Sequence, residues 1–296
     1  MLNAERRMLI NLETRKAQAH SFRAMHRGGK ILVLPNVWDV ASARIIEEAG
    51  YGAIATTSAG VAFSLGYPDG QKILPAEMLA RVARIANAGK VPVTADVEAG
   101  YGNRPEDAAR TARGVLEAGA VGMNLEDGTG DPAHPLVDLP LQLEKIHAIR
   151  EAALKTGVPL VLNARTDVYL DQVGEPEARY EHTVKRLLAF RDAGADCVFA
   201  PGLRDPQTIK QLVAEVQCPL NILAGSGSPS ISDLQELGVA RVSLGSGPMR
   251  ATLGLLRRMA EELKTSGTYQ SLDGAPSHAE INRLLSPAET DPNGAH

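Results

Sequence analysis

Carboxylate, amide and guanidinium side chains occur as pairs two residues apart at three points in the chain. The pairs are Asp96 with Glu98, Asn124 with Glu126, and Asn163 with Arg165. Each pair ends or directly follows a short apolar run, and residues two apart on a strand point to the same face. If these runs are strands that face one interior, three carboxylates and one guanidinium converge on one small space.

Three carboxylates in one small space predict a bound cation, because without one they repel each other or one of them stays protonated. All the ligands offered are oxygens, which favours Mg²⁺, with Mn²⁺ as an alternative, over Zn²⁺. A second interpretation is that the acids only form buried salt bridges with Arg165 and Arg44. We disfavour it because the acids outnumber the cations and would leave buried charge unpaired.

Other chemistries lack their residues. No predicted strand ends in the Lys of a Schiff-base aldolase, and nearly all histidines fall on predicted helices or termini, away from a zinc site. His134 follows the fourth predicted strand, so it either reaches the substrate or is an exposed loop residue without a role. The Gly-Ser loops Gly225–Pro229 and Gly245–Pro248 either bind a phosphate or simply form turns.

The polar pairs belong to a regular series of apolar runs that predict eight strands. Continuous apolar character, without strict alternation, is typical of strands covered on both faces in a parallel sheet wrapped by helices. The predicted strands are Ile31–Leu34, Ala53–Thr57, Val91–Ala95, Val121–Leu125, Leu160–Ala164, Cys197–Ala200, Leu220–Leu223 and Arg241–Leu244.

Helix signals alternate with these strands. Proline marks a first helical turn at Pro75, Pro105 and Pro206. A glycine suited to a left-handed cap precedes the next strand four times, at Gly50, Gly119, Gly194 and Gly238. This recurrence favours an α/β fold of the (β/α)8 TIM-barrel type, in which the chemistry lies at the carboxyl ends of the strands.

The chain is predicted to be one catalytic barrel domain over residues 1–264, followed by a C-terminal extension over 265–296. An extra helix is expected over Met1–Gly28, before the first strand, and an amphipathic helix over Met249–Lys264, after the last. The final residues, 286–296, are expected to be a flexible tail.

Composition favours a small-molecule partner. The 296 residues carry a formal charge of −4 without a basic cluster, which argues against nucleic acid. No run approaches the roughly 18 apolar residues of a membrane span, and the N-terminus lacks a signal-peptide pattern, so a cytoplasmic protein without a membrane partner is expected. Cys197 and Cys218 lack metal or redox spacing and are predicted to be buried free thiols.

Several motifs together resemble the isocitrate lyase/phosphoenolpyruvate mutase superfamily, in order, from about Leu34 to Met259. The subgroup with the form Asp-x-Glu-x-Gly-Tyr-Gly is the most similar. The segments that carry the resemblance are Leu34–Arg44, Thr56–Gly60, Gly66–Gly70, Ala95–Gly102, Asn124–Asp127 and Asn163–Asp167.

The resemblance implies a barrel whose last helix swaps onto a neighbouring subunit in a homodimer or homotetramer. It also implies a small 2-oxo carboxylic acid or its enolate as the substrate, bound to Mg²⁺. Asp96 would bind the metal directly, and Asp69, Glu98 and Glu126 would act through water. Thr57, Ser58 and Ala59 would hold the substrate carboxylate, and Arg165 its other anionic end or its oxo group.

Departures from the superfamily pattern narrow the activity. The loop Gly128–Pro135 replaces the segment that carries the catalytic Cys of the lyases, Gly202 stands where they have Glu, and only Asn221 remains of a later substrate-binding segment. These changes disfavour 2-methylisocitrate lyase activity. Ala55 replaces an aromatic residue of the phosphonopyruvate mutases and hydrolases, and Glu98 replaces their usual Asp, which disfavours that activity.

The leading hypothesis is a Mg²⁺-dependent lyase or decarboxylase that makes or breaks a C–C or P–C bond next to an enolate, with an oxaloacetate-type substrate favoured. Arg165 and Glu126 are the expected catalytic residues, and Tyr101 and His134 are candidate acids by position. The two disfavoured activities remain alternatives. Because the lyase Cys is missing, a non-catalytic 2-oxo acid binding protein is a rival, and a phosphosugar barrel enzyme that uses the Gly-Ser loops is a third interpretation.

Overall fold

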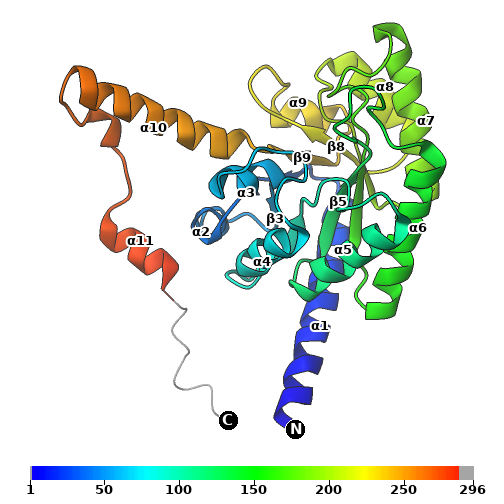
Figure 1. Cartoon of the computed structure of the whole chain (residues 1–296), viewed down its shortest axis with the longest axis horizontal. Coiled ribbons are helices and arrows are strands. Elements are labelled where there is room, and N and C mark those ends of the chain that lie inside the picture. Colours follow the sequence, from blue (N-terminus) through cyan, green and yellow to red (C-terminus); the bar gives the residue numbers. More distant parts are fainter. Residues whose placement is uncertain (1, 287–296) are drawn as a thin grey trace.

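The computed structural model describes residues 2–286 and forms a barrel of parallel strands surrounded by helices (Figure 1). Every neighbouring pair of strands is parallel. The strands are β1 (Leu32–Leu34), β2 (Asn36–Val37), β3 (Ile54–Thr56), β4 (Val93–Ala95), β5 (Gly122–Glu126), β6 (Val161–Arg165), β7 (Cys197–Phe199), β8 (Leu220–Leu223) and β9 (Arg241–Ser243).

The barrel closes through the first two strands. β1 pairs with β9 and β2 pairs with β3, and only Pro35 separates β1 from β2. Because proline has no N–H to donate, the ladder is interrupted there. The predicted first strand therefore continues past Leu34 as β2, and the predicted TIM-barrel fold is confirmed.

The outer helices begin and end where the sequence predicts. Pro75, Pro105 and Pro206 each stand in the first turn of a helix, and the four predicted cap glycines have φ values of 87°, 95°, 107° and 87°. The helices are α2 (Val40–Glu48), α3 (Ser58–Ser64), α4 (Pro75–Ala86), α5 (Pro105–Glu117), α6 (Leu139–Thr156), α7 (Arg179–Asp192), α8 (Pro206–Val216) and α9 (Ile231–Glu236), with a 3₁₀ turn at Pro176–Ala178.

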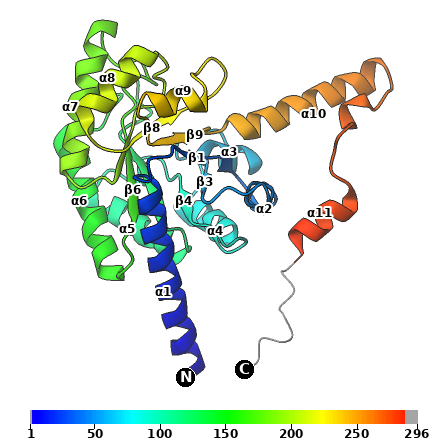
Figure 2. The same cartoon turned by 180° about the vertical axis from the view of Figure 1, so that it is seen from behind.

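The predicted extra helix before the first strand is present as α1 (Leu2–Met25). It covers the end of the barrel at which the strands begin (Figure 2). Phe22 is fully buried in a cluster with small barrel residues that include Ala53 and Ala55. This apolar plug leaves the carboxyl ends of the strands as the open mouth of the barrel.

Helix α10 (Gly247–Thr265) extends away from the barrel instead of packing along it (Figures 1 and 2). A 3₁₀ turn (Gln270–Leu272) and α11 (His278–Leu285) follow, and α11 returns to α2, where Arg44 Nε donates to Leu284 O at 3.2 Å. Most of the predicted flexible tail lies outside the described residues. Helix swapping is not tested by a single chain and stays a prediction.

Cys197 and Cys218 are both free, as predicted; Cys197 is buried as predicted, whereas Cys218 is only partly buried. Among residues 2–286, no helix has the length and apolar character needed to cross a membrane.

Candidate functional site

A cavity of about 270 Å³ opens at the carboxyl ends of the strands. Side chains from nearly every strand end meet there, as expected for a barrel enzyme. The cavity is lined by Asn36, Thr57, Ser58, Ala59, Asp69, Asp96, Asn124, Arg165, Leu170, Phe199, Leu223, Ser243, Gly245, Ser246 and Arg250. Predicted substrate-binding residues Thr57, Ser58, Ala59, Asp96 and Arg165 are thus brought together, with the predicted metal ligand Asp69.

Asp96 lies at the centre of a hydrogen-bond network directly after β4. Its Oδ2 accepts from the backbone N–H of Ser58 at 2.9 Å and from Ser58 Oγ at 2.8 Å. Its own N–H donates to Thr56 Oγ1 at 2.8 Å, which fixes the chain where it leaves the strand. Ser58, predicted to hold the substrate carboxylate, therefore binds Asp96 here and must share its donors if a substrate enters.

Two asparagines connect Asp96 to the next strands. Asn124 Nδ2 donates to Asp96 Oδ1 at 3.4 Å, and Asn163 Nδ2 donates to Asn124 Oδ1 at 2.8 Å. Both asparagines occupy register positions on β5 and β6 that lie opposite each other. This relay orients the Asp96 carboxylate toward the cavity without placing a cation beside it.

Glu98 is positioned by a turn. β4 ends at Ala95 and Glu98 has a φ of 53°, a left-handed conformation that non-glycine residues seldom adopt. Its carboxylate accepts from Gln71 N and, at 3.5 Å, from Tyr101 Oη, while Tyr101 N donates to Gln71 Oε1 at 2.7 Å. Gln71 and Tyr101 also have left-handed backbone conformations. The hydrogen bonds among these three residues therefore stabilise three unfavourable backbone conformations around Glu98.

The acids around the cavity affect one another's pKa values. Burial, followed by the charges of Asp96 and Asp69, raises the pKa of Glu98 to about 7. The side chain of Asp69 is exposed overall, yet partial burial of its carboxyl and the charge of Asp96 raise its pKa too. Burial and the neighbouring negative charges both raise these pKa values, and a bound cation would relieve the repulsion between the charges.

Arg165, at the end of β6, is already engaged by two acids. Its Nη1 lies 2.7 Å from Glu126 Oε2, and its Nε and Nη2 donate to the two oxygens of Asp167 at 2.5 and 3.1 Å. Burial alone would lower the pKa of Arg165, but the two carboxylates outweigh it and raise the pKa. Burial, opposed by Arg165, raises the pKa of Glu126. The salt-bridge interpretation therefore holds for Glu126 alone among the three predicted interior acids.

Arg44 takes no part in the site. Its Nη1 lies 2.8 Å from Glu47 on α2, so it is not the second cation that the salt-bridge interpretation needs. Asp96 and Glu98 have no basic partner among the described residues.

Asp127, next to Glu126, belongs to the framework of the site. It is fully buried, its Oδ2 accepts from Arg186 Nε at 2.6 Å, and its Oδ1 accepts from Asp167 N at 2.9 Å. The Asp127–Arg186 pair thereby fixes the backbone that carries Asp167, which in turn holds Arg165.

The remaining predicted site residues do not line the cavity. Asn221 is fully buried beneath it and exchanges hydrogen bonds with Ser243, which does line it. Tyr101 Oη lies 3.5 Å from Glu98 Oε1, and the pKa of its phenol is raised by burial and then by the Glu98 charge. His134 is 84% exposed in a loop and lies 3.4 Å from Asp131, which agrees with the interpretation of an exposed loop residue.

The donor set suits a metal held largely through water. Within residues 2–286, no three His, Cys, Asp or Glu side chains are close enough to hold one ion together. Mg²⁺ commonly keeps several waters and takes only one or two carboxylates from the protein. Asp96 and Asp69 are the two carboxylates that line the cavity.

Sequence reasoning missed four residues of the site. Asn36 accepts from the N–H groups of Leu244 and Gly245 at 2.7 and 2.8 Å and so fixes the loop after β9. Ser243 and Arg250 line the cavity, and Asp167 holds Arg165. Position after a strand could have indicated Ser243 and Asp167, whereas the placement of Arg250 depends on the angle at which α10 leaves the barrel.

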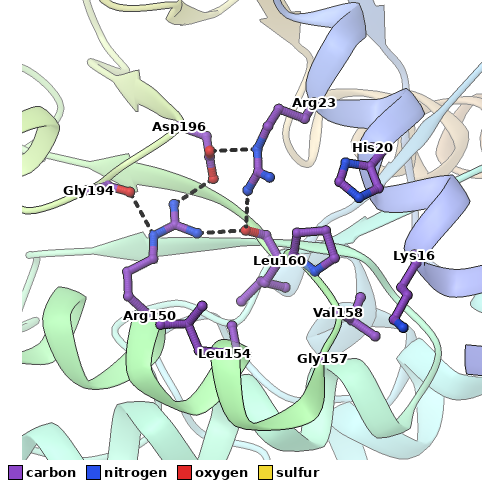
Figure 3. Close-up of a pocket in the computed structure, with 12 residues that line it drawn as sticks. Lys16, His20, Arg23, Arg150, Leu154, Gly157, Val158, Leu160, Gly194 and Asp196 are labelled. Carbon is purple, nitrogen blue, oxygen red and sulfur yellow. Dashed lines mark hydrogen bonds and ion pairs between the residues drawn. The ribbon is translucent and has the colours of Figure 1, made fainter.

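A second cavity, of about 570 Å³, lies at the opposite end of the barrel between α1 and α6 (Figure 3). It is lined by basic residues, but Arg23 and Arg150 both bind Asp196, at 2.8 and 2.5 Å, and both donate to Leu160 O. These guanidinium groups stabilise the contact between α1 and the barrel. The cavity has no acid–base pair free for chemistry, so the mouth at Asp96 is the better candidate site.

Comparison with known proteins points to one family. The phosphoenolpyruvate phosphomutase family matches residues 22–264. An uncharacterized protein of Mycobacterium tuberculosis (strain ATCC 25618 / H37Rv) is 39% identical over 79% of this chain and 84% of its own. 2-Methylisocitrate lyase of Bacillus subtilis is 27% identical over 88% and 87%, and oxaloacetate decarboxylase 2 of Pseudomonas fluorescens is 28% identical over 85% and 86%.

A solved structure agrees with the fold. The crystal structure of a putative lyase/mutase from Burkholderia cenocepacia J2315 has a TM-score of 0.87 at 39% identity. The match covers 93% of this chain and 98% of that one.

Proposed function

Because the chain belongs to the phosphoenolpyruvate phosphomutase family, within the isocitrate lyase/phosphoenolpyruvate mutase superfamily, we propose that it is a Mg²⁺-dependent lyase or decarboxylase. Its substrate is a small 2-oxo carboxylic acid, and an oxaloacetate-type acid is favoured. The observation that carries the proposal is Asp96, a buried carboxylate without a basic partner that lines the cavity beside two further acids.

The metal, when bound, supplies a Lewis acid that stabilises negative charge on the oxo group as an enolate forms. Asp96 would hold the ion, and Asp69, Glu98 and Glu126 would bind its water shell. Raised carboxyl pKa values support this assignment, because the ion returns these groups to their charged form. Thr57 and Ala59, with Ser58 shared with Asp96, line the wall where the substrate carboxylate would bind.

Arg165 has a fixed orientation in this scheme. Asp167 and Glu126 both form ion pairs with it, and its guanidinium carbon lies 5.8 Å from the centre of the Phe199 ring. A cation locked in place acts without reorganisation when charge develops on the substrate. Arg165 therefore stabilises the oxo group of the bound acid from the β6 side of the cavity.

The reaction is best tested by a substrate panel. Protein and Mg²⁺ are incubated with oxaloacetate, phosphonopyruvate and 2-methylisocitrate, and pyruvate is followed by NMR. Pyruvate from oxaloacetate, above the spontaneous rate measured without protein, is the expected result. Pyruvate from phosphonopyruvate or 2-methylisocitrate alone would instead assign one of the alternative activities. Binding of the acids without any product would favour a non-catalytic binding protein.

Asp96→Asn tests the metal assignment. We expect at least about a hundredfold loss of turnover, because one charged ligand and the geometry it imposes are removed. Asp131→Asn is the matched control, since Asp131 is an exposed loop carboxylate beside His134. Full activity in Asp96→Asn, with Mg²⁺ still bound in a calorimetric titration, would contradict the proposal.

We also propose that the protein is a homodimer or homotetramer in which α10 packs on a neighbouring subunit. The support is that α10 leaves its own barrel while carrying exposed leucines (Figure 1).

A further inference from the structure

The second cavity, between α1 and α6, is bordered by more positive than negative charge (Figure 3). Three cations, Lys16, Arg23 and Arg150, line it together with one acid, Asp196. The lining side chains therefore carry a surplus of two positive charges at neutral pH. His20 lies on the same face of α1 as Lys16 and Arg23, and it adds positive charge when it is protonated.

Asp196 cannot neutralise both arginines that it binds. Its Oδ1 accepts from Arg23 Nε at 2.8 Å, and its Oδ2 accepts from Arg150 Nη2 at 2.5 Å and from Leu162 N at 2.9 Å. Because two guanidinium groups share this single carboxylate, one of their positive charges stays uncompensated. The contact between α1 and the barrel is thus held together with an excess of positive charge beside the cavity.

Two of the three cations still have donors to offer a ligand. All three nitrogens of Arg150 donate to protein oxygens. Arg23 donates from Nε and Nη2, whereas its Nη1 has no hydrogen-bond partner among residues 2–286. Lys16 pairs with Glu13 at 2.9 Å on the same helix, but Glu13 is 71% exposed, and a surface ion pair of this kind contributes little.

Another part of the cavity wall is apolar. Leu154 near the end of α6 and Val158 just after that helix both line it, and Leu154 is 81% exposed. Covering an exposed leucine with an apolar group is favourable, because apolar surface is removed from water. The volume of about 570 Å³ lies within the range of about 300–1,000 Å³ found for small-molecule sites. The cavity therefore suits an anion that carries a small apolar group.

We propose that this cavity binds an organic phosphate monoester, with the phosphate at Arg23 and Lys16 and the apolar group against Leu154 and Val158. A phosphate monoester carries a charge of about −1.5 to −2 at pH 7, which matches the surplus of positive charge. Its oxygens accept from a guanidinium and an ammonium at the same time. The inference is independent of the proposed function, because this cavity shares no lining residue with the cavity at Asp96.

Binding is tested on the full-length protein in a metal chelator, with phenyl phosphate as the probe. Inorganic phosphate lacks the apolar group, and benzyl alcohol lacks the charge. Calorimetric titration should show phenyl phosphate binding at least about tenfold more tightly than inorganic phosphate, because the ring buries apolar surface, and benzyl alcohol should not bind detectably. Hydrogen–deuterium exchange with phenyl phosphate should slow in α1 and in residues 153–160, which the ligand would connect.

Charge reversal at the cavity provides the matched variants. Lys16→Glu should weaken phenyl phosphate binding at least about tenfold, because a repelling charge replaces an attracting one, and Lys16→Arg should keep the affinity within about threefold. Lys155→Glu is the control, because Lys155 is a 71% exposed lysine of α6 that does not line the cavity. Its affinity for phenyl phosphate should stay within about threefold of the unmodified protein, since salt screens distant surface charges.

Four results would overturn the inference. The first is the absence of phenyl phosphate binding at millimolar concentration, and the second is equal affinity in the unmodified protein and Lys16→Glu. The third is slowed exchange at residues 57–60 instead of α1, which would place the phosphate in the cavity at Asp96. Equal affinities for phenyl phosphate and inorganic phosphate are the fourth, because they would indicate an adventitious ion only.

Discussion

Two aspartates of similar burial have opposite surroundings in this barrel. Asp127 is paired with Arg186 at 2.6 Å and receives a backbone N–H, whereas Asp96 receives only neutral donors and lies beside other acids. The ion pair of Asp127 stabilises the folded chain. Asp96 and its neighbouring acids repel each other until a cation binds, which makes the folded chain less stable without the ligand. Substitution of Asp127 should therefore lower mainly the stability, and substitution of Asp96 should lower mainly the activity.

Asp127→Asn should lower the free energy of unfolding by about 3–5 kcal/mol, because the Arg186 charge would remain buried without its partner. Asp96→Asn should leave the stability of the metal-free protein unchanged or raised, since it removes one of several mutually repelling carboxylates. Urea unfolding of both variants in a metal chelator measures the difference. Equal destabilisation by the two substitutions would contradict this division of roles.

At the scale of elements, continuous apolar runs, first-turn prolines and cap glycines were enough to predict the strands and most helices. The exact position of Glu98 was not predictable, because the argument from strand alternation stops at Ala95 and no residue type signals a left-handed glutamate. Helix α11 was missed because it is short and docks on α2 through contacts far apart in sequence, such as Arg44 with Leu284. Convergence of the acids was predictable, whereas the partners of Arg165 were not.

The docking of α1 under the barrel depends on a neutral histidine. His26 is buried, and its Nδ1 lies 2.8 Å from Phe22 O. Its ring contacts the Phe22 ring edge to face, with 4.8 Å between the ring centroids. Because a carbonyl only accepts, Nδ1 carries the proton. Burial, and then the charge of Arg241, lowers the pKa of His26 to about 4 from an ordinary value of 6.5.

Acid should therefore loosen this contact within a defined pH window. His26 becomes protonated below about pH 6.5 in the unfolded chain but only below about pH 4 in the folded chain. The free energy of unfolding therefore falls as the pH drops through this interval and levels off below it. The loss is roughly 3 kcal/mol at about 1.36 kcal/mol per pKa unit. His26→Asn, which keeps a donor for Phe22 O, should lack this part of the pH dependence in urea titrations.

His20→Asn is the control for this measurement, because His20 is exposed on the same helix. If the unmodified protein and His26→Asn lose stability in parallel between pH 6.5 and pH 4, His26 is not the group responsible.

At the scale of the whole molecule, the proposed oligomer would cover an apolar face of α10 that its own barrel leaves exposed. Leu253, Leu256 and Leu263 are 44%, 56% and 48% exposed, and their spacing of three and seven residues places them on one side of the helix. The helix projects away from its barrel in both views, so the barrel does not cover this face (Figures 1 and 2). A second copy that offers the same helix would bury it in a symmetric contact.

Replacement of Leu256 by aspartate should therefore dissociate the oligomer. Burial of a leucine contributes about 2 kcal/mol, and a twofold contact counts it twice, so association should weaken roughly a thousandfold or more. Light scattering after gel filtration measures the mass directly. Leu154→Asp is the matched control, because Leu154 is 81% exposed on α6, at the other end of the barrel. A monomeric unmodified protein at micromolar concentration would contradict self-association through α10.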